Sequence, residues 1–248
     1  MAVTALQAGT AVLALRRGRR DYADGVWGPG LAAVALTGAV AGNGDPVRRW
    51  VLAGATAAWA ARLERLMLTR LRDHDEEDPR YAKMLGDGGF SLAVRRVFLV
   101  QGLVMWFVSL PVQVGAVTGT RWSWLVGIGV VVWVVGLLFE SVGDAQLTAY
   151  KADPDRKPVM DRGLWGWTRH PNYFGDFAVW WGIWLVGGLA GGFLPALTIV
   201  SPAAMAFFLI FASGAKLLEQ TMMKRPGYPE YAERTPMFFP WPPKKRIS

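Results

Sequence analysis

Seven apolar segments constrain this chain more than any other feature. They occupy residues 2–15, 26–42, 50–68, 97–117, 122–147, 173–193 and 194–214. An α-helix needs about 20 apolar residues to cross the hydrocarbon core of a bilayer, and all segments except the first two approach that length. A soluble domain would instead place its apolar residues in stripes of three or four along each helix. The sequence therefore predicts an all-α polytopic membrane protein with about seven transmembrane helices.

Lysine and arginine gather on one side of this predicted topology. If the chain threads back and forth, residues 16–20, 69–96, 148–172 and 215–248 share that side and hold 22 of the 27 Lys and Arg, against 3 in the opposite loops. Such an excess marks the cytoplasmic side of a membrane protein. We therefore expect the N-terminus outside and the C-terminus in the cytoplasm. The same bias accounts for much of the net charge of +8. No nucleic-acid-binding motif accompanies it, so we expect no nucleic-acid partner.

The residue inventory excludes several kinds of site. The chain has no cysteine and two histidines. Disulfides, thiolate nucleophiles and zinc–thiolate sites are therefore excluded, and we expect no metal site. No internal repeat or low-complexity linker divides the sequence, so we treat residues 1–248 as one domain.

Two acids lie near the cytoplasmic end of the fifth segment. A helix from Trp122 to Tyr150 would be about 43 Å long, more than a bilayer requires. Glu140 and Asp144 are four residues apart, so both carboxylates share one helix face. Two negative charges near lipid are costly unless a cation, a hydroxyl group or water binds them. Basic residues such as Lys151 could neutralise them, or they could hold the polar part of a ligand.

Residues 161–176 form the most informative stretch. Pro171 suits the first turn of a helix, because its missing N–H is not needed there. The helix would present its N-terminus to the cytoplasm, with Arg169 and His170 beside it, an arrangement suited to a phosphate. Trp165 and Tyr173 could stack on a flat heterocycle. The same residue types also form the aromatic belt and lipid-headgroup anchors of membrane proteins, so both interpretations stay open.

Three more features add charge near this predicted end. Asp176 lies one turn after Asn172 in an otherwise apolar segment, where an acid has to be used or paired. Lys216 and Glu219 follow the seventh segment. The tail then interleaves bases with acids and with Tyr228, Tyr231 and Arg234. We interpret this tail as a folded lid over the site, with an amphipathic segment on the membrane surface as the alternative.

These motifs resemble the steroid 5α-reductase superfamily, and most closely its bacterial membrane branch. The similarity covers nearly the whole chain and extends to sterol C14 reductases and isoprenylcysteine methyltransferases. Its strongest parts are Gly163-Leu164-Trp165, Thr168 to Asp176, Leu218-Glu219, Pro229-x-Tyr231 and Arg234-Thr235. Weaker parts are Asp24-x-x-Trp27, Trp59-x-x-Arg62-Leu63, Glu77-Asp78-x-Arg80-Tyr81, Gln101 and Pro111.

The resemblance implies a seven-helix reductase of the bacterial inner membrane that binds NADPH from the cytoplasm. Residues 118–248 would bind the cofactor, and residues 1–117 would supply the substrate-side helices. Hydride from NADPH would saturate the activated C=C bond of a lipophilic steroid-like or isoprenoid enone. The expected cofactor-binding residues are Glu140, Asp144, Lys151, Trp165, Arg169, His170, Asn172, Tyr173, Asp176, Lys216, Glu219, Tyr228, Tyr231 and Arg234.

The substrate half departs from the family pattern. Steroid reductases use a Glu and a Tyr to polarise the substrate ketone, whereas Trp59 stands at the Tyr position here. The acid would then come from Asp24, Glu64 or Tyr81. Two alternatives remain open. One is an S-adenosylmethionine-dependent membrane methyltransferase, and the other is a non-catalytic sterol- or lipid-binding protein of the same fold. A lipophilic small molecule and membrane lipid are the expected partners. The oligomeric state does not follow from the sequence.

Overall fold

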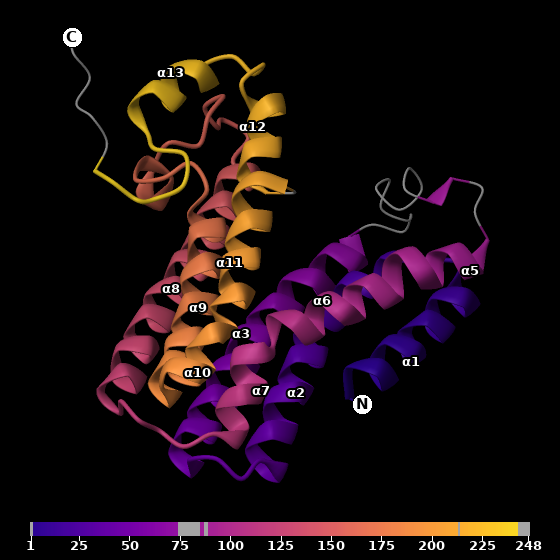
Figure 1. The fold of residues 1–248 in the computed structure, drawn as a ribbon. Coiled ribbons are helices and arrows are strands. Elements are labelled where there is room, and N and C mark those ends of the chain that lie inside the picture. The colour runs from indigo at the N-terminus through magenta and orange to yellow at the C-terminus, as the bar shows by residue number, and fades with distance from the viewer. Residues whose placement is uncertain (1, 74–84, 87–88, 213, 243–248) are drawn as a thin grey trace. The chain divides into compact units, whose positions relative to one another are not determined.

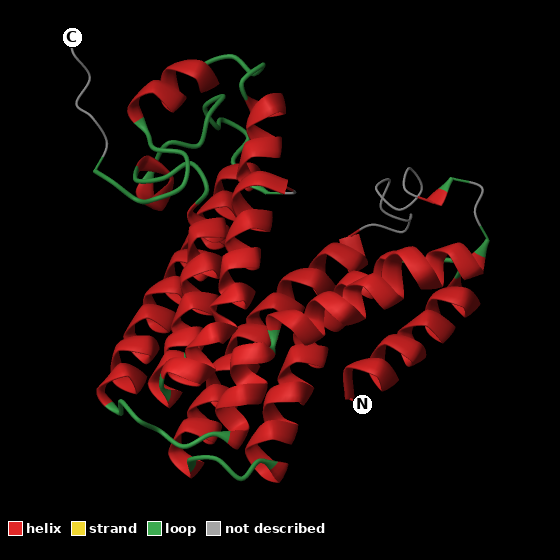
Figure 2. Cartoon of the chain, viewed as in Figure 1, coloured by secondary structure: helices red, strands yellow, loops and turns green. Residues whose placement is uncertain are grey.

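The computed structural model describes residues 2–73, 85–86, 89–212 and 214–242. Within these residues every regular element is helical and there is no strand (Figure 2), which confirms the all-α class. The first half contains α1 (Ala2–Arg17), η1 (Asp21–Val26), α2 (Trp27–Ala41), α3 (Pro46–Asp73), α5 (Phe90–Ala93), η2 (Val94–Leu99), α6 (Val100–Val108) and α7 (Leu110–Val117). The second half contains α8 (Trp124–Ala152), η3 (Gly163–Gly166), α9 (Pro171–Gly187), η4 (Leu189–Gly191), α10 (Phe193–Ala196), η5 (Leu197–Ile199), α11 (Val200–Phe207), η6 (Phe208–Ala212), α12 (Ala215–Met222) and α13 (Tyr228–Arg234).

Three helical stretches of the described chain are long and apolar enough to cross a membrane. They are Phe90–Val108, Trp124–Ala152 and Phe193–Met222. The helices α1, α2 and α9 are shorter, with 16, 15 and 17 residues. The structure thus supports a helical membrane protein. Seven spans and the orientation of the termini remain predictions.

One face of α8 carries large apolar side chains that no other part of the described chain covers. Val131, Val135, Leu138 and Val142 recur at steps of four, three and four residues, and all are exposed, Val131 at 62% and Leu138 at 56%. A continuous apolar face of this kind is costly in water. Contact with lipid removes that cost, in agreement with the membrane assignment.

The described chain divides into two compact units. Unit 1 comprises residues 1–126 and 183–201, and unit 2 comprises residues 127–182 and 202–248. The helices of both units are labelled in Figure 1.

In unit 1, a buried arginine connects the first turn of α3 to the C-terminal end of α7. Arg48, in the first turn of α3, is only 1% exposed. Its Nη2 donates to the carbonyl oxygen of Gly115 at 3.1 Å and to the Thr118 hydroxyl at 2.7 Å. A buried carbonyl without a donor is costly. Arg48 therefore holds the end of α7 against the start of α3.

The fourth apolar segment of the sequence is not one straight helix. It is interrupted at Ser109, between α6 and α7, where ψ is 1°. Pro111 follows in the first turn of α7. Proline cannot donate a backbone hydrogen bond, so it ends one helix and is tolerated at the start of the next.

In unit 2, α8 and α9 pack unusually closely through glycine. A methyl group added at Gly136 would lie 2.6 Å from the carbonyl oxygen of Gly175 and 2.6 Å from the amide nitrogen of Val179. On the other side, a methyl group at Gly175 would lie 2.5 Å from the amide nitrogen of Glu140. Only glycine permits such an approach of two backbones. The contact brings the acidic face of α8 against the first turns of α9.

This close contact gives a prediction about stability. We expect Gly136→Ala to destabilise the protein by about 1–3 kcal/mol, because the added methyl group forces the two helices apart. The matched control is Gly127→Ala on the same helix, where an added methyl group meets nothing within 4 Å. There the higher helix propensity of alanine should stabilise the protein by up to about 1 kcal/mol. Thermal unfolding in detergent measures both variants, and equal midpoints would contradict the packing described.

Candidate functional site

The segment between η3 and α9 is organised by backbone contacts around Thr168. Its hydroxyl donates to the carbonyl oxygen of Phe238 at 2.8 Å and accepts from the amide of His170 at 3.3 Å. The helix then starts at Pro171, as predicted. Its first turn closes with the amide of Phe174 donating to the carbonyl oxygen of His170 at 3.0 Å. Thr168 therefore joins the start of α9 to the C-terminal tail.

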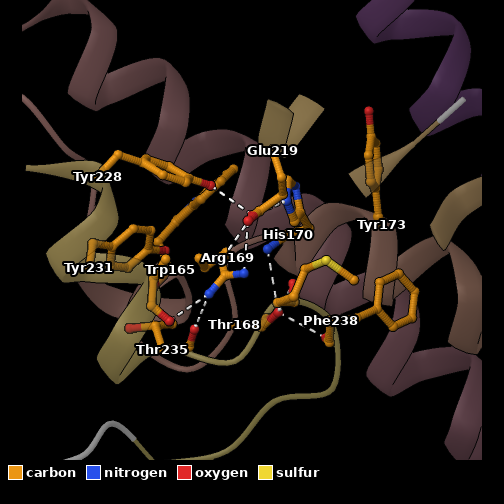
Figure 3. A network of polar contacts seen from close by, with 12 residues as sticks. Trp165, Thr168, Arg169, His170, Tyr173, Glu219, Tyr228, Tyr231, Thr235 and Phe238 are labelled. Atoms are coloured by element: carbon orange, nitrogen blue, oxygen red, sulfur yellow. Dashed lines mark hydrogen bonds and ion pairs between the residues drawn. The ribbon is translucent and has the colours of Figure 1, made fainter. Parts of the chain in front are cut away.

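Glu219 is the centre of a buried polar network (Figure 3). It lies on the buried side of α12, four residues after the buried Ala215. One carboxylate oxygen, Oε1, accepts from Arg169 Nε at 2.8 Å and from the Tyr228 hydroxyl at 2.9 Å. His170 Nε2 lies 2.9 Å from the same oxygen. A carboxylate that meets several donors, one of them charged, is well compensated for its burial.

Arg169 uses most of its hydrogen-bonding capacity inside the protein. Its Nη2 donates to Glu219 Oε2 at 2.8 Å, completing a bidentate pair, and its Nη1 donates to the carbonyl oxygens of Ala232 and Thr235, both at 2.7 Å. A guanidinium has five N–H donors, so about four are used here. Arg169 thus fixes the tail, and its expected contact with a cofactor remains a prediction.

The two tail tyrosines are buried donors. The Tyr231 hydroxyl donates to the carbonyl oxygen of Trp165 at 2.5 Å, and the Tyr228 hydroxyl donates to Glu219. Burial raises the pKa of both phenols well above the usual range, and the charge of Glu219 raises the pKa of Tyr228 further. Both therefore stay neutral and keep the proton that they donate.

An ion pair and further backbone contacts complete the attachment of the tail. Arg234 Nη2 lies 2.5 Å from Asp161 Oδ2, and the amide of Trp241 donates to the carbonyl oxygen of Trp167 at 2.9 Å. The turn before α13 requires Gly227, whose φ is 76°. The tail is thus folded against residues 161–170, and its action as a lid over a ligand remains a prediction.

The Tyr231 contact gives a second prediction. We expect Tyr231→Phe to lower the free energy of unfolding by about 1 kcal/mol, because the carbonyl oxygen of Trp165 loses its donor while the ring stays packed. Limited proteolysis should also cleave the tail of this variant sooner. Tyr150→Phe is the matched control, since its hydroxyl donates to the carbonyl oxygen of Lys157 in an exposed turn. Equal effects of the two variants would show that the Tyr231 hydrogen bond stabilises the protein no more than an exposed one does.

A second polar group joins α8 to α9. Asn172 Nδ2 donates to Asp144 Oδ1 at 3.2 Å, and Asn172 Oδ1 accepts from the amide of Tyr173 at 3.1 Å. Glu140, one turn before Asp144, is 4% exposed. Asp176 lies one turn after Asn172 and is half-buried. The structure therefore brings the carboxylate of Asp144 and the amide of Asn172 together at the start of α9, which the sequence could place only on separate helices.

The remaining expected cofactor residues lie around these two groups. The ring of Tyr173 stacks on His170, with centroids 5.6 Å apart, and Trp165 Nε1 donates to the carbonyl oxygen of Gly143 at 3.0 Å. Lys151 and Lys216 are exposed. The Nζ of Lys216 lies 5.6 Å above the ring of Phe211. Neither lysine forms an ion pair within the described residues.

A polar cavity of about 420 Å³ lies beside this region. It is lined by residues from the end of α8 and the following loop, including Gln146, Tyr150, Arg156, Lys157, Asp161 and Arg162. Asp161 is neutralised by Arg234, which leaves the three bases of the loop to face the cavity with Asp153 and Asp155. Such a lining can receive a phosphate-bearing group.

Gln146 is a site residue that the sequence analysis missed. Its Oε1 accepts from the amide of Leu164 at 3.0 Å, which holds η3 against α8. The only signal in the sequence is a polar side chain close to the end of a long apolar helix. Its partner is a backbone amide, which no residue motif encodes.

The expected catalytic acids belong to unit 1. Asp24, in η1, accepts a hydrogen bond from Gln101 Nε2 at 3.3 Å. Glu64 lies half-buried on α3, and Trp59 on the same helix is 3% exposed. Tyr81 lies outside the described residues. In the described part of the chain, no three His, Asp or Glu side chains form a group that could hold a metal ion.

Comparisons with known proteins give a family and one partial relative. A family model described as "Protein of unknown function (DUF1295)" matches residues 11–235. The nickel-cobalt-cadmium resistance protein NccN of Alcaligenes xylosoxydans xylosoxydans is 25% identical over 133 residues, which are 52% of this chain. The match covers 59% of the length of that relative. No solved structure matches the chain.

Proposed function

Because the chain belongs to the DUF1295 family, which is steroid 5α-reductase-like, we propose that it is an NADPH-dependent membrane reductase. It saturates the activated C=C bond of a lipophilic steroid-like or isoprenoid substrate. The proposal includes membership of the steroid 5α-reductase superfamily, seven spans in the bacterial inner membrane and a cofactor site that faces the cytoplasm.

One observation carries the proposal most directly. The carboxylate of Asp144 and the amide of Asn172 meet, 3.2 Å apart, at the N-terminus of α9. A carboxylate and an amide together offer both acceptors and donors, which fits the carboxamide of a nicotinamide ring. The N-terminus of a helix also favours negative charge, which fits a pyrophosphate.

The surrounding residues fit the rest of the cofactor. The polar cavity of the 146–162 region carries Arg156, Lys157 and Arg162, which suit a phosphorylated ribose. The network around Glu219 fixes the tail, so the side of the site that the tail forms is rigid before any ligand arrives. A rigid site loses less entropy when it binds.

Within this proposal each part of the chain has a task. NADPH supplies the hydride when it is bound. The residues around Asp144 and Asn172 orient it, and the folded tail excludes water from the reacting atoms. The reaction also needs an acid that holds a proton at the substrate carbonyl, and Asp24, Glu64 and Tyr81 are the candidates.

Transfer of isotope from cofactor to product tests the function. The purified protein in nanodiscs is given NADPH deuterated at C4 and a panel of steroidal, isoprenoid and fatty-acyl enones. We expect deuterium in the saturated product, detected by mass spectrometry. The variant that removes the proton donor, among Asp24→Asn, Glu64→Gln and Tyr81→Phe, should lower turnover about 10²- to 10⁴-fold without weakening NADPH binding. Methyl transfer from labelled S-adenosylmethionine to the same classes of lipid would overturn the proposal in favour of a methyltransferase.

A further inference from the structure

Unit 1 contains a large apolar cavity that the proposed reaction does not use. Its volume is about 770 Å³, and it lies among α1, α2, η2, α6 and α7. Val34, Phe98, Leu103 and Trp106 are among its apolar lining residues. Cavities of about 300–1,000 Å³ are typical of sites for small organic ligands. The size and lining therefore suit a hydrocarbon body.

Gln7 gives this cavity a polar point. The residue lines the cavity and is only 5% exposed. Its Nε2 donates to Met105 Sδ at 3.3 Å. A thioether sulfur has no hydrogen and can only accept, so this contact identifies the amide atom of Gln7 beside the sulfur as the nitrogen. The carbonyl oxygen Oε1 is then left buried, without a hydrogen-bond partner.

Two other polar residues of the lining, Thr37 and Gln113, also offer acceptors. The Thr37 hydroxyl donates to the carbonyl oxygen of Ala33 at 2.7 Å. Gln113 Nε2 donates to the carbonyl oxygen of Trp106 at 3.0 Å and to Ser109 Oγ at 2.8 Å. Since these donors are used within the protein, what remains for a ligand is mainly lone pairs. Such a lining favours a ligand that donates a hydrogen bond over one that accepts it.

This cavity is separate from the described residues that are expected to act on a carbonyl. Asp24, Trp59 and Glu64 are not among its lining residues. A ketone needs a donor, whereas Gln7 Oε1 needs one itself. The ligand chemistry therefore differs from that of the proposed enone substrate.

We propose that this cavity binds a long-chain alcohol, with the hydrocarbon body against the apolar lining and the hydroxyl donating to Gln7 Oε1. A buried acceptor without a donor is costly, and a bound hydroxyl removes that cost once the amide turns toward it. The site takes its ligand directly from the bilayer and goes beyond the proposed reductase activity.

The test uses two photoactivatable probes that differ only in the donor. One is a long-chain alcohol with a diazirine in its chain, and the other is its methyl ether. Both are equilibrated with the full chain in nanodiscs, and cross-linked peptides are mapped by mass spectrometry. We expect the alcohol to label α1, α2 and α6 about 5- to 20-fold more strongly than the ether. Equal labelling by the two probes, or labelling elsewhere in the chain, would overturn the proposal.

Two glutamine variants separate recognition from packing. Gln7→Met should bring labelling by the alcohol down to that of the ether, while the unfolding midpoint without ligand stays the same or rises, because an unpaired acceptor is lost. Gln113 lines the same cavity, and the Gln113→Met variant should keep the preference for the alcohol. Loss of the preference in both variants, or in neither, would contradict the role of Gln7. A third variant, Ala8→Phe, fills the cavity and should lower labelling by both probes, and unchanged labelling would place the probes elsewhere.

Discussion

Replacing Glu219 by alanine is expected to lower the free energy of unfolding by about 3–5 kcal/mol, more than Gly136→Ala or Tyr231→Phe. The carboxylate is the common acceptor of Arg169, His170 and Tyr228, and its side chain is 12% exposed. Without it, the guanidinium of Arg169 stays buried without its counter-charge. The tail that Arg169 holds through Ala232 and Thr235 should then detach.

Thermal unfolding and proteolysis of the tail measure this effect. Glu230→Ala, at an exposed position in the first turn of α13, is the matched control and should change stability by less than about 0.5 kcal/mol. The double variant Arg169→Met with Glu219→Met should recover part of the lost stability, because it removes both charges together. A Glu219→Ala protein as stable as the Glu230→Ala protein would show that the network is not what holds the tail.

The second large effect is expected at Asn172. We expect Asn172→Ala to weaken NADPH binding about 10- to 100-fold, since a hydrogen bond to a charged or polar cofactor group contributes about 1.5–3 kcal/mol. The unfolding midpoint without ligand should fall little, because the bond from Asn172 to Asp144 is partly exposed. Equilibrium titration of cofactor fluorescence measures the affinity.

The sequence offers a matched control for this experiment, because its only other asparagine is Asn43. Asn43 is exposed in the turn between α2 and α3, so Asn43→Ala should bind NADPH as the unchanged protein does. Equal affinities of the Asn172→Ala and Asn43→Ala variants would remove Asn172 from the cofactor site.

Much of the helical architecture follows from the sequence, because apolar periodicity and proline are local signals. The start of α9 at Pro171 and the length of α8 are read in this way. The interruption at Ser109 was missed, although Pro111 was its signal. The contact of Gly136 with Gly175 could not be predicted, because it depends on how two helices meet in space.

The residues of the candidate site could be predicted from the sequence, but the role of each residue could not. From the sequence, Arg169 is expected to contact a phosphate, since a base beside a helix N-terminus suits one. In the structure its partner is Glu219, 50 positions further along the chain, and backbone oxygens of the tail. Long-range pairings of this kind leave no spacing pattern. The unpaired carbonyl oxygen of Gln7 likewise could not be predicted, because the sequence of α1 indicates only an apolar membrane anchor.

The central claim is that unit 2 binds NADPH, and the unfolding midpoint of the purified protein tests it most directly. A ligand that binds only the folded state must raise the unfolding midpoint. At a ligand concentration 100 times the dissociation constant, it stabilises the folded state by about 2.7 kcal/mol. NADPH, NADH and S-adenosylmethionine are compared on the unchanged protein and on Asp176→Ala. The account predicts a rise with NADPH that exceeds the rise with NADH and disappears in Asp176→Ala. A rise with S-adenosylmethionine alone, or with none of the three, would contradict it.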